Sequence, residues 1–143
     1  MPEGNDTYLT EMDVRIFLRD VDPAANLLLD DYEFGTEEIR TAATLAVDYW
    51  NETPPPITTT RWEWTNFPWR YNLLKGTAAN LLFMAAHLYR RNKLNYQVPG
   101  GGISDQDKNV DYDNAGQRLW NEYTSWCAWN KKSQNVHRGW GSI

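Results

Sequence analysis

The side chains in this sequence that could bind a transition metal are its two histidines, His87 and His137, and its single cysteine, Cys127. No two of them stand at the spacing of zinc ligands, which usually occur as close pairs. His87 lies within an apolar stretch of helical period, where a core or interface histidine is more common than a ligand. The sequence therefore predicts no metal site built from these three residues.

Two further stretches share part of their pattern with ligand-binding loops. Residues 105–109 begin like a calcium loop, but Val110 stands where glycine is needed and Gly116 where a glutamate is needed. The glycines at 100–102 lack the lysine and the serine or threonine that follow in a phosphate loop. We interpret the first stretch as the acidic start of the last helix and the second as a helix–helix connection, so no cofactor is expected.

Catalytic groups are equally difficult to assign. Cys127 has no histidine close to it in the sequence, and its aromatic neighbours at helical spacing indicate packing. Glu38, Glu63 and Glu122 could form a carboxylate pair for hydrolysis only if the fold brings two of them together. We expect no catalytic residue and no enzyme activity, with a small hydrolase that uses such a pair as the alternative.

Basic residues in the second half of the chain gather where helices are expected to end: Arg90, Arg91, Lys93, Lys131, Lys132 and Arg138. Cations at these positions suit the negative end of a helix dipole. The net charge is −5, and no motif that reads nucleic acid is present. We therefore expect no sequence-specific binding of DNA or RNA.

Length and composition bound the class of protein. The 143 residues suffice for one domain with its own core. Eight Trp and eight Tyr are many for this length and are typical of interfaces, although they could equally form a core. One cysteine cannot form an internal disulfide, the first residues are polar and acidic, and no apolar run is long enough for a bilayer. These features favour a protein of a reducing compartment that does not enter a membrane.

Charge is unevenly distributed along the chain. Residues 1–38 carry eleven acidic residues and two arginines, a balance of −9, whereas the remainder has a balance of +4. Surfaces of opposite charge on one small protein could attract each other between copies, although a solvated mixed surface would show the same numbers. On the basic side of a contact between subunits we expect some of four arginines: Arg70, Arg90, Arg91 and Arg118.

Apolar residues at three- and four-residue steps predict helices along most of the chain. The first helix is expected from Met12 to Arg19, with Thr10 as its cap, Asp13 at the capping-box position and an apolar face made of Val14, Phe17 and Leu18. The second follows Gly35, with Thr36 as its cap.

A long central helix should organise the rest. It is expected to begin at Phe67-Pro68-Trp69, with Pro68 at the first helical position. A glycine loop separates it from a last helix, which should begin near Ser104 or Asp105 and end at about Lys132. Small residues on the central helix would let a neighbouring helix approach closely: Gly76, Ala78, Ala79, Ala85 and Ala86.

The predicted fold is mainly α, a small bundle of three to four helices over residues 1–132 with an extended arm at about 53–66 and a flexible C-terminal tail at 133–143. A lone extended arm leaves backbone groups unpaired, so we expect it to pack on a neighbouring subunit through Trp62 and Trp64 rather than on its own bundle. The tail is too poor in apolar residues to fold alone, and Arg138, Trp140 and Ile143 are its expected partner-binding residues.

The sequence resembles head–tail connectors of tailed bacteriophages, also called adaptor or head-completion proteins. The resemblance covers about residues 36–143, and the first 35 residues match no family. It rests on these features: Phe67-Pro68-Trp69 before the central helix, Asn92-x-x-Asn95-Tyr96, the glycine turn with Ser104, Lys108, the run Tyr123–Trp126–Trp129, Lys131-Lys132 and the ending Asn135-x-x-Arg138-Gly139-Trp140-Gly141.

The resemblance implies a virion structural protein of the phage neck, assembled in the host cytoplasm. Its subunits would form a homo-oligomeric ring of about twelve copies that bridges the portal protein and a downstream neck or tail protein. DNA would pass through the ring without sequence-specific binding, and the tail would dock on an adjacent ring, with the portal as the first expectation. A tail-completion or tail-terminator protein is the alternative within the same class of assembly proteins.

Overall fold

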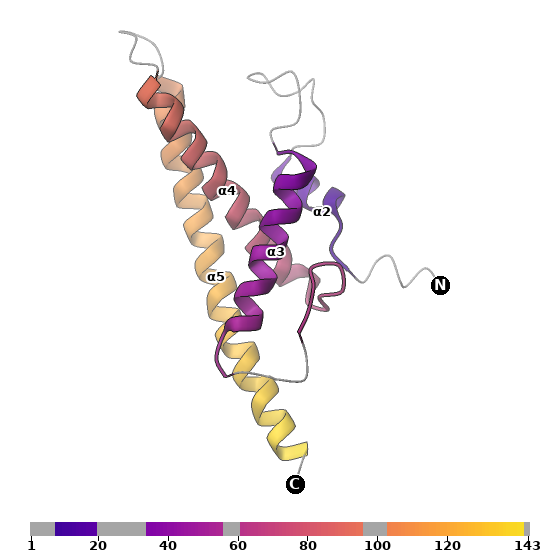
Figure 1. Ribbon diagram of the computed structural model, residues 1–143. Helices are drawn as coiled ribbons and strands as arrows, with labels where there is room; N and C mark the ends of the chain where they lie inside the picture. The colour runs from indigo at the N-terminus through magenta and orange to yellow at the C-terminus, as the bar shows by residue number, and fades with distance from the viewer. Residues whose placement is uncertain (1–7, 20–33, 56–60, 96–102, 142–143) are drawn as a thin grey trace.

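A computed structural model describes residues 8–19, 34–55, 61–95 and 103–141 of the chain. It contains four α-helices in these ranges: α2 (Glu11–Leu18), α3 (Thr36–Glu52), α4 (Arg70–Asn95) and α5 (Ile103–Gly141). Figure 1 shows α4 and α5 side by side as a long antiparallel pair, with α3 packed on them and α2 against α3 and α4. The mainly α bundle predicted from the sequence is therefore confirmed, and none of the residues just given forms a β-strand.

The start of α2 follows the predicted capping box. The Thr10 hydroxyl accepts from the Asp13 backbone N–H at 3.2 Å, and the Thr10 backbone N–H donates to the Asp13 carboxylate at 2.9 Å. These reciprocal bonds satisfy two of the backbone donors that a helix start leaves unpaired. The chain leaves α2 at Arg19 in the left-handed conformation, with φ of 63°.

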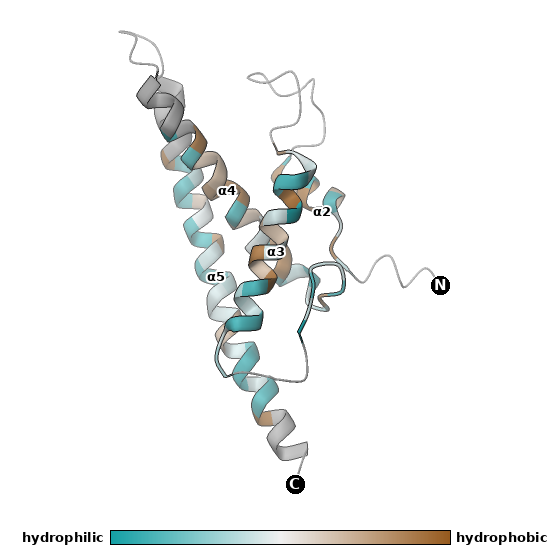
Figure 2. Ribbon diagram, viewed as in Figure 1, coloured by the Kyte–Doolittle hydropathy of each residue, from teal (hydrophilic) through white to brown (hydrophobic). Residues whose placement is uncertain are grey.

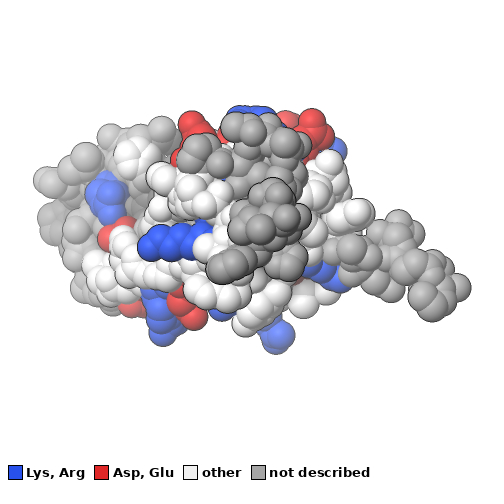
Figure 3. All heavy atoms as spheres, turned by 90° about the horizontal axis from the view of Figure 1, so that it is seen from below, with Lys and Arg blue, Asp and Glu red and all other residues white. Residues whose placement is uncertain are grey.

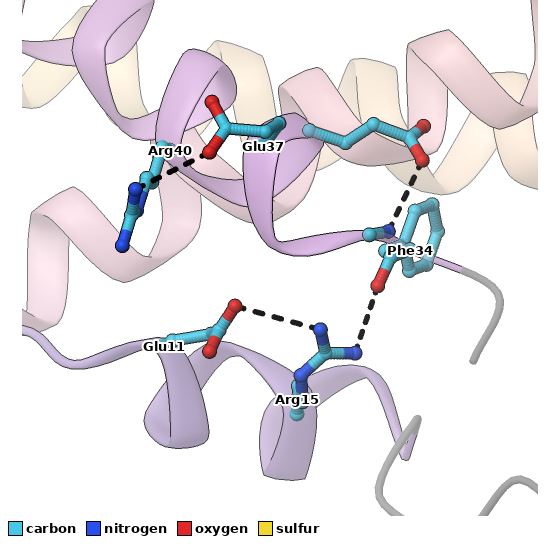
Figure 4. A network of polar contacts seen from close by, with 7 residues as sticks. Glu11, Arg15, Phe34, Glu37 and Arg40 are labelled. Carbon is cyan, nitrogen blue, oxygen red and sulfur yellow. Dashed lines mark hydrogen bonds and ion pairs between the residues drawn. The ribbon is translucent and has the colours of Figure 1, made fainter.

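Helix α3 begins one residue earlier than predicted, because Gly35 and not Thr36 is its N-cap. The Gly35 backbone N–H donates to the Glu38 carboxylate at 3.1 Å, so the acidic residue in the first turn supplies the cap. Nearby, the buried Arg15 of α2 donates to the Phe34 carbonyl at 2.8 Å and contacts Glu11 at 3.5 Å (Figure 4). This guanidinium joins α2 to the start of α3.

Helix α4 begins later than predicted. Its first helical residue is Arg70, and the Trp69 carbonyl accepts from the Leu73 backbone N–H at 3.0 Å. Pro68 thus lies outside the helix, not at its first helical position. The proline still prevents the helix from extending backwards, because it disfavours helical geometry in the residue before it.

Close contact between α4 and α5 depends on glycine, as the small residues of α4 predicted. A Cβ atom on Gly76 would lie 2.9 Å from the Tyr123 ring of α5. A Cβ on Gly116 of α5 would lie 3.0 Å from the Phe83 ring of α4. The aromatic rings therefore occupy the space that each missing side chain leaves free.

Helix α5 extends farther than predicted at its C-terminal end. The predicted end at about Lys132 was wrong, since the helix continues to Gly141. Figure 1 shows its last turns running past the lower end of α3. The segment 133–141 of the predicted tail is thus helical, and residues 142 and 143 lie outside the described ranges.

The interior is unusually aromatic. Eight rings form one continuous series of contacts, with centroid separations of 5.1 to 6.2 Å: Trp62, Trp69, Trp50, Phe67, Trp126, Tyr123, Trp120 and Tyr49. Trp50 and Tyr123 are fully buried within it. Many of the aromatic residues therefore belong to the core, which was the second of the two roles that the composition allowed.

Apolar residues gather where α3 meets α4, and α5 is more hydrophilic along its length (Figure 2). The buried face of α3 consists of one regular stripe: Ile39, Ala42, Ala43, Ala46, Val47 and Trp50. Within the described ranges, no helix combines the length and the apolar character that crossing a membrane would require.

Candidate interaction surfaces

The predicted arm packs on its own bundle, which corrects the expectation that it packs only on a neighbour. Asn51 at the end of α3 donates to the Trp62 carbonyl at 3.0 Å and accepts from the Trp62 backbone N–H at 3.1 Å. One side-chain amide thus satisfies both backbone groups that an isolated extended residue would leave unpaired. Residues 56–60 of the arm lie outside the described ranges.

Trp62 and Trp64 are half-buried against the core of the same chain. Both line an open pocket of about 430 Å³ between α3 and residues 61–65. Its charged lining residues include Asp48 and Arg61, which lie 3.9 Å apart, and Glu63. The two tryptophans therefore hold the arm to α3 and present only part of their surface to a partner.

The three acids considered for hydrolysis have separate surroundings. Glu38 caps α3, Glu122 of α5 lies 3.7 Å from Lys75 of α4, and Glu63 belongs to the pocket beside α3. All three are exposed. Each glutamate thus has its own environment, and a carboxylate pair made from them is a prediction that these contacts do not support.

Around Cys127, buried side chains of α5 make polar contacts with α3. The Tyr123 hydroxyl donates to the Ala46 carbonyl, and Asn130 accepts from the Trp50 indole N–H at 2.9 Å. The Lys131 ammonium lies 4.2 Å from the centre of the Trp50 ring and donates to the Asn51 carbonyl of α3 at 3.2 Å. These contacts fasten the middle of α5 to the end of α3.

Burial shifts the pKa values of two groups in this cluster, Cys127 and Lys131. It raises the pKa of the Cys127 thiol to about 12, although Tyr123 and Lys131 act in the opposite direction. It lowers the pKa of Lys131, partly offset by the attraction of Cys127. A thiol that keeps its proton at neutral pH is a poor nucleophile and a poor metal ligand. The interpretation of Cys127 as a packing residue is therefore supported.

Histidine and cysteine do not gather with acids anywhere in the ranges that the structure covers, where no group of three such residues could hold a metal. His87 is exposed on α4, so its interpretation as a core residue was wrong and only the interface interpretation stays open. His137 lies in α5, but its side chain is not among those described.

An exposed apolar groove lies between α2 and α4. Ile16 and Phe17 of α2 are 56% and 41% exposed, and Tyr71 of α4 is 65% exposed. With Leu74 they line a cavity of about 290 Å³. We call this surface the α2–α4 groove.

The charged residues of the α2–α4 groove are Asp13 and Arg70, which form an ion pair at 2.8 Å. Partial burial acts to raise the pKa of Asp13, but the Thr10 N–H and the Arg70 guanidinium outweigh it and lower that pKa. This contact places an acid of the first 38 residues against a predicted interface arginine within one chain. Contact of Arg70 with an acid of the next copy stays a prediction, and within the subunit its guanidinium already pairs with Asp13.

A second exposed apolar surface lies on the C-terminal half of α5. Trp129 is 63% exposed and Val136 is 54% exposed, and a separation of seven residues puts them on one helix face. Lys132 between them is exposed as well. We call these three residues the α5 face. Seen from below in Figure 3, Lys and Arg side chains are spread between uncharged residues, and Asp and Glu lie mainly toward the edge.

The remaining predicted contact residues are only partly placed. Arg90 on α4 and Arg118 on α5 are exposed, as a contact would require. The backbone at 91, 138 and 140 is helical, but the side chains of Arg91, Arg138 and Trp140 are not among those described. Ile143 lies outside the described ranges. Arg90 and Arg118 are thus the two residues of this set whose side chains the structure describes.

Sequence reasoning missed the α2–α4 groove. It assigned Phe17 to the buried face of α2 with Val14, but Val14 is buried and Phe17 is 41% exposed. The available signal was that α2 is apolar on more than one side, because Met12 and Ile16 stand off the Val14 stripe and are each 56% exposed. A short helix with two apolar faces has only one to bury in its own bundle.

Comparisons with known proteins returned no matching family model, no similar curated protein and no similar solved structure.

Proposed function

We propose that this chain is a structural assembly protein of the phage neck, a head–tail connector whose copies form a ring between the portal and the tail and extend the DNA channel. The observation that carries the proposal is the pair of exposed apolar surfaces, the α2–α4 groove and the α5 face. Solvent-exposed apolar surface of this kind is typical of sites that another protein covers. The resemblance of residues 36–143 to connectors supplies the biological setting.

Two different surfaces on one subunit suit a ring. A symmetric dimer needs one self-complementary patch, whereas a closed ring needs two distinct patches that match each other. The long α4–α5 pair adds reach, because α5 with its 39 residues spans about 58 Å. A subunit of this length can contact its neighbours and also the rings above and below it.

The proposal is tested by the native mass of the purified full chain over a range of concentrations, together with electron microscopy of the particles. We expect a closed ring of identical subunits that binds portal rings from the same virus. A chain that stays monomeric at every concentration, or that forms only a two-fold dimer, would contradict the proposal.

The alternatives are separated by related measurements. A tail-completion or tail-terminator protein would also form a ring, but it would bind tail tubes and not portal rings. A small hydrolase would require the pocket beside α3, where Asp48 and Glu63 lie near Trp62 and Trp64. Hydrolysis of any substrate that is lost in Glu63→Gln without loss of folding would favour that alternative.

A further inference from the structure

The two exposed surfaces differ in shape and charge in a way that makes them complementary. The α2–α4 groove is concave and apolar at Ile16, Phe17 and Tyr71. On the α5 face, Trp129 and Val136 are exposed apolar side chains on one side of a helix. They lie on different parts of the molecule, since α5 runs past the lower end of α3 while α2 packs against the upper part of α3 (Figure 1).

The distribution of charge along the sequence also favours contact between these two surfaces. The segments that lead into and out of α2, residues 1–7 and 20–33, contain seven acidic residues and no basic residue. From residue 129 to the end, the chain contains three basic residues, Lys131, Lys132 and Arg138, and no acidic one. Lys131 is buried against Trp50, so Lys132 is the cation exposed on the α5 face itself.

We propose that the C-terminal turns of α5 in one copy dock in the α2–α4 groove of a second copy, an inference that rests on the proposed assembly function. Trp129 and Val136 would insert between Ile16, Phe17 and Tyr71, as the apolar face of an amphipathic helix enters a groove. Lys132 would bring a positive charge to a part of the receiving chain that is rich in acidic residues in its sequence.

This contact is heterologous, because each copy gives its α5 face to one neighbour and its α2–α4 groove to the other. Repetition of such a contact closes a ring when the rotation between copies allows it, and otherwise forms a filament. A single helix in a shallow groove binds weakly, but each copy in a closed ring is held at two contacts at once.

The test is cross-linking between copies with a flexible bifunctional maleimide. Cysteine is introduced as Ile16→Cys in the groove of one preparation and as Val136→Cys on the α5 face of another, and the two are mixed. The native Cys127 is fully buried and does not compete for the reagent. The matched control pairs Val136→Cys with Leu45→Cys, since Leu45 is 49% exposed on α3 and belongs to neither surface.

We expect the Ile16→Cys and Val136→Cys mixture to give cross-linked dimers in clear excess over the control mixture, with a yield that falls as salt is raised. The single variants Phe17→Asp and Val136→Asp should each weaken assembly at least about tenfold, whereas Leu45→Asp should change it less than about twofold. These residues are exposed, so the helix content measured by circular dichroism should stay unchanged.

The inference is overturned if rings form while the groove and α5-face cysteines cross-link no more than the control pair does; the proposed function would then survive through another contact. It is also overturned if a chain carrying both cysteines cross-links only within itself, because its own α5 or terminus would then cover the groove. Absence of any oligomer at every concentration would instead remove the proposed function together with this contact.

Discussion

Lys131 is 1% exposed, although the adjacent Lys132 is exposed. Its ammonium group lies over the Trp50 ring and donates to the Asn51 carbonyl at 3.2 Å. An ammonium in an apolar interior loses its hydration, which is why burial lowers the pKa of Lys131. The indole ring and the helix-end carbonyl offset part of that loss, so two neighbouring lysines of one helix have different roles.

We predict that Lys131→Ala lowers the free energy of unfolding by about 2–4 kcal/mol, because it removes a buried stem from the Trp50 contact. Lys132→Ala serves as the matched control and should change stability by less than about 0.5 kcal/mol. Lys131→Met should cost less than Lys131→Ala, since it keeps the stem and removes the desolvated charge. Urea unfolding measures all three; equal losses for the two alanine variants would contradict the structural difference between the lysines.

Because of Cys127, the free energy of unfolding should depend on pH in the alkaline range. Burial raises its pKa from 9.0 to about 12, so between these values the folded state keeps a proton that the unfolded state releases. Stability contributed by this group therefore falls as pH rises through that window, by up to about 1.4 kcal/mol per pH unit. Lys131 acts in the opposite direction, because its lowered pKa makes stability rise with pH.

The measurement is the slope of the unfolding free energy against pH above the ordinary pKa of a thiol. Cys127→Ala should make that slope less negative than in the wild type, whatever the variant does to stability at neutral pH. A thiol reagent should label Cys127 only after urea is added. Identical slopes in both proteins, or rapid labelling of the native chain, would show that the thiol is not protected by burial.

At the scale of helices and loops, the sequence was sufficient to predict a contact where the two residues that form it are close together along the chain. Thr10 and Asp13 are three residues apart, and their capping box was predicted correctly. Asn51 and Trp62 are separated by a stretch with three consecutive prolines, and the two bonds between them depend on the path of the chain in space. No periodic pattern marks such a pair, so the docking of the arm on its own bundle could not be predicted.

The end of α5 was missed for a related reason. Gly139 and Gly141 have low helix propensity, at a cost of about 1 kcal/mol each relative to alanine, and they suggested an irregular tail. No proline follows Lys132, however, and a helix already 30 residues long at that point needs no new nucleation to continue. Elongation of an existing helix therefore outweighed the glycine propensities.

We predict that Gly76→Ala destabilises the fold. Helix propensity alone would favour alanine by about 1 kcal/mol, but the new Cβ would lie 2.9 Å from the fully buried Tyr123 ring. Overpacking of this kind typically costs about 1–3 kcal/mol, so a net loss of stability is expected. Gly116→Ala is the comparison, because its nearest neighbour is the half-buried Phe83 ring, which can turn away, although the Ala79 carbonyl oxygen would also lie 3.3 Å from the new Cβ. Thermal unfolding that shows Gly76→Ala more stable than the wild type would contradict the close packing of α4 on α5.

At the scale of the whole molecule, the charge balance predicted attraction between the acidic first part of one copy and basic residues of the next. Part of that attraction lies within the chain, in the Asp13–Arg70 pair. Which surfaces remain exposed is a property of the packed bundle, because α2 and α5 each carry apolar residues that their own bundle does not bury. The α2–α4 groove and the α5 face therefore became visible only with the fold.

The last prediction concerns deletion of residues 134–143, which separates a docking element from a terminus with no role. Within the deleted part, Gln134 is half-buried and Asn135 and Val136 are exposed, so these residues contribute little to the core. The truncated chain should lose the helical signal of residues 134–141 and less than about 1 kcal/mol of unfolding free energy. Its copies should nevertheless fail to form the ring, because Val136 is removed from the α5 face.

Val136→Asp in the full chain is the control for this deletion, since it removes the apolar contact and keeps most of the helix. Native mass and urea unfolding should give the same result for both variants, a nearly unchanged subunit that no longer assembles. If the truncated chain forms rings and joins heads to tails at the normal yield, the C-terminal turns have no role in assembly. If both variants unfold at much lower urea than the wild type, these turns belong to the core, and their loss from the particle would follow from instability rather than from a missing contact.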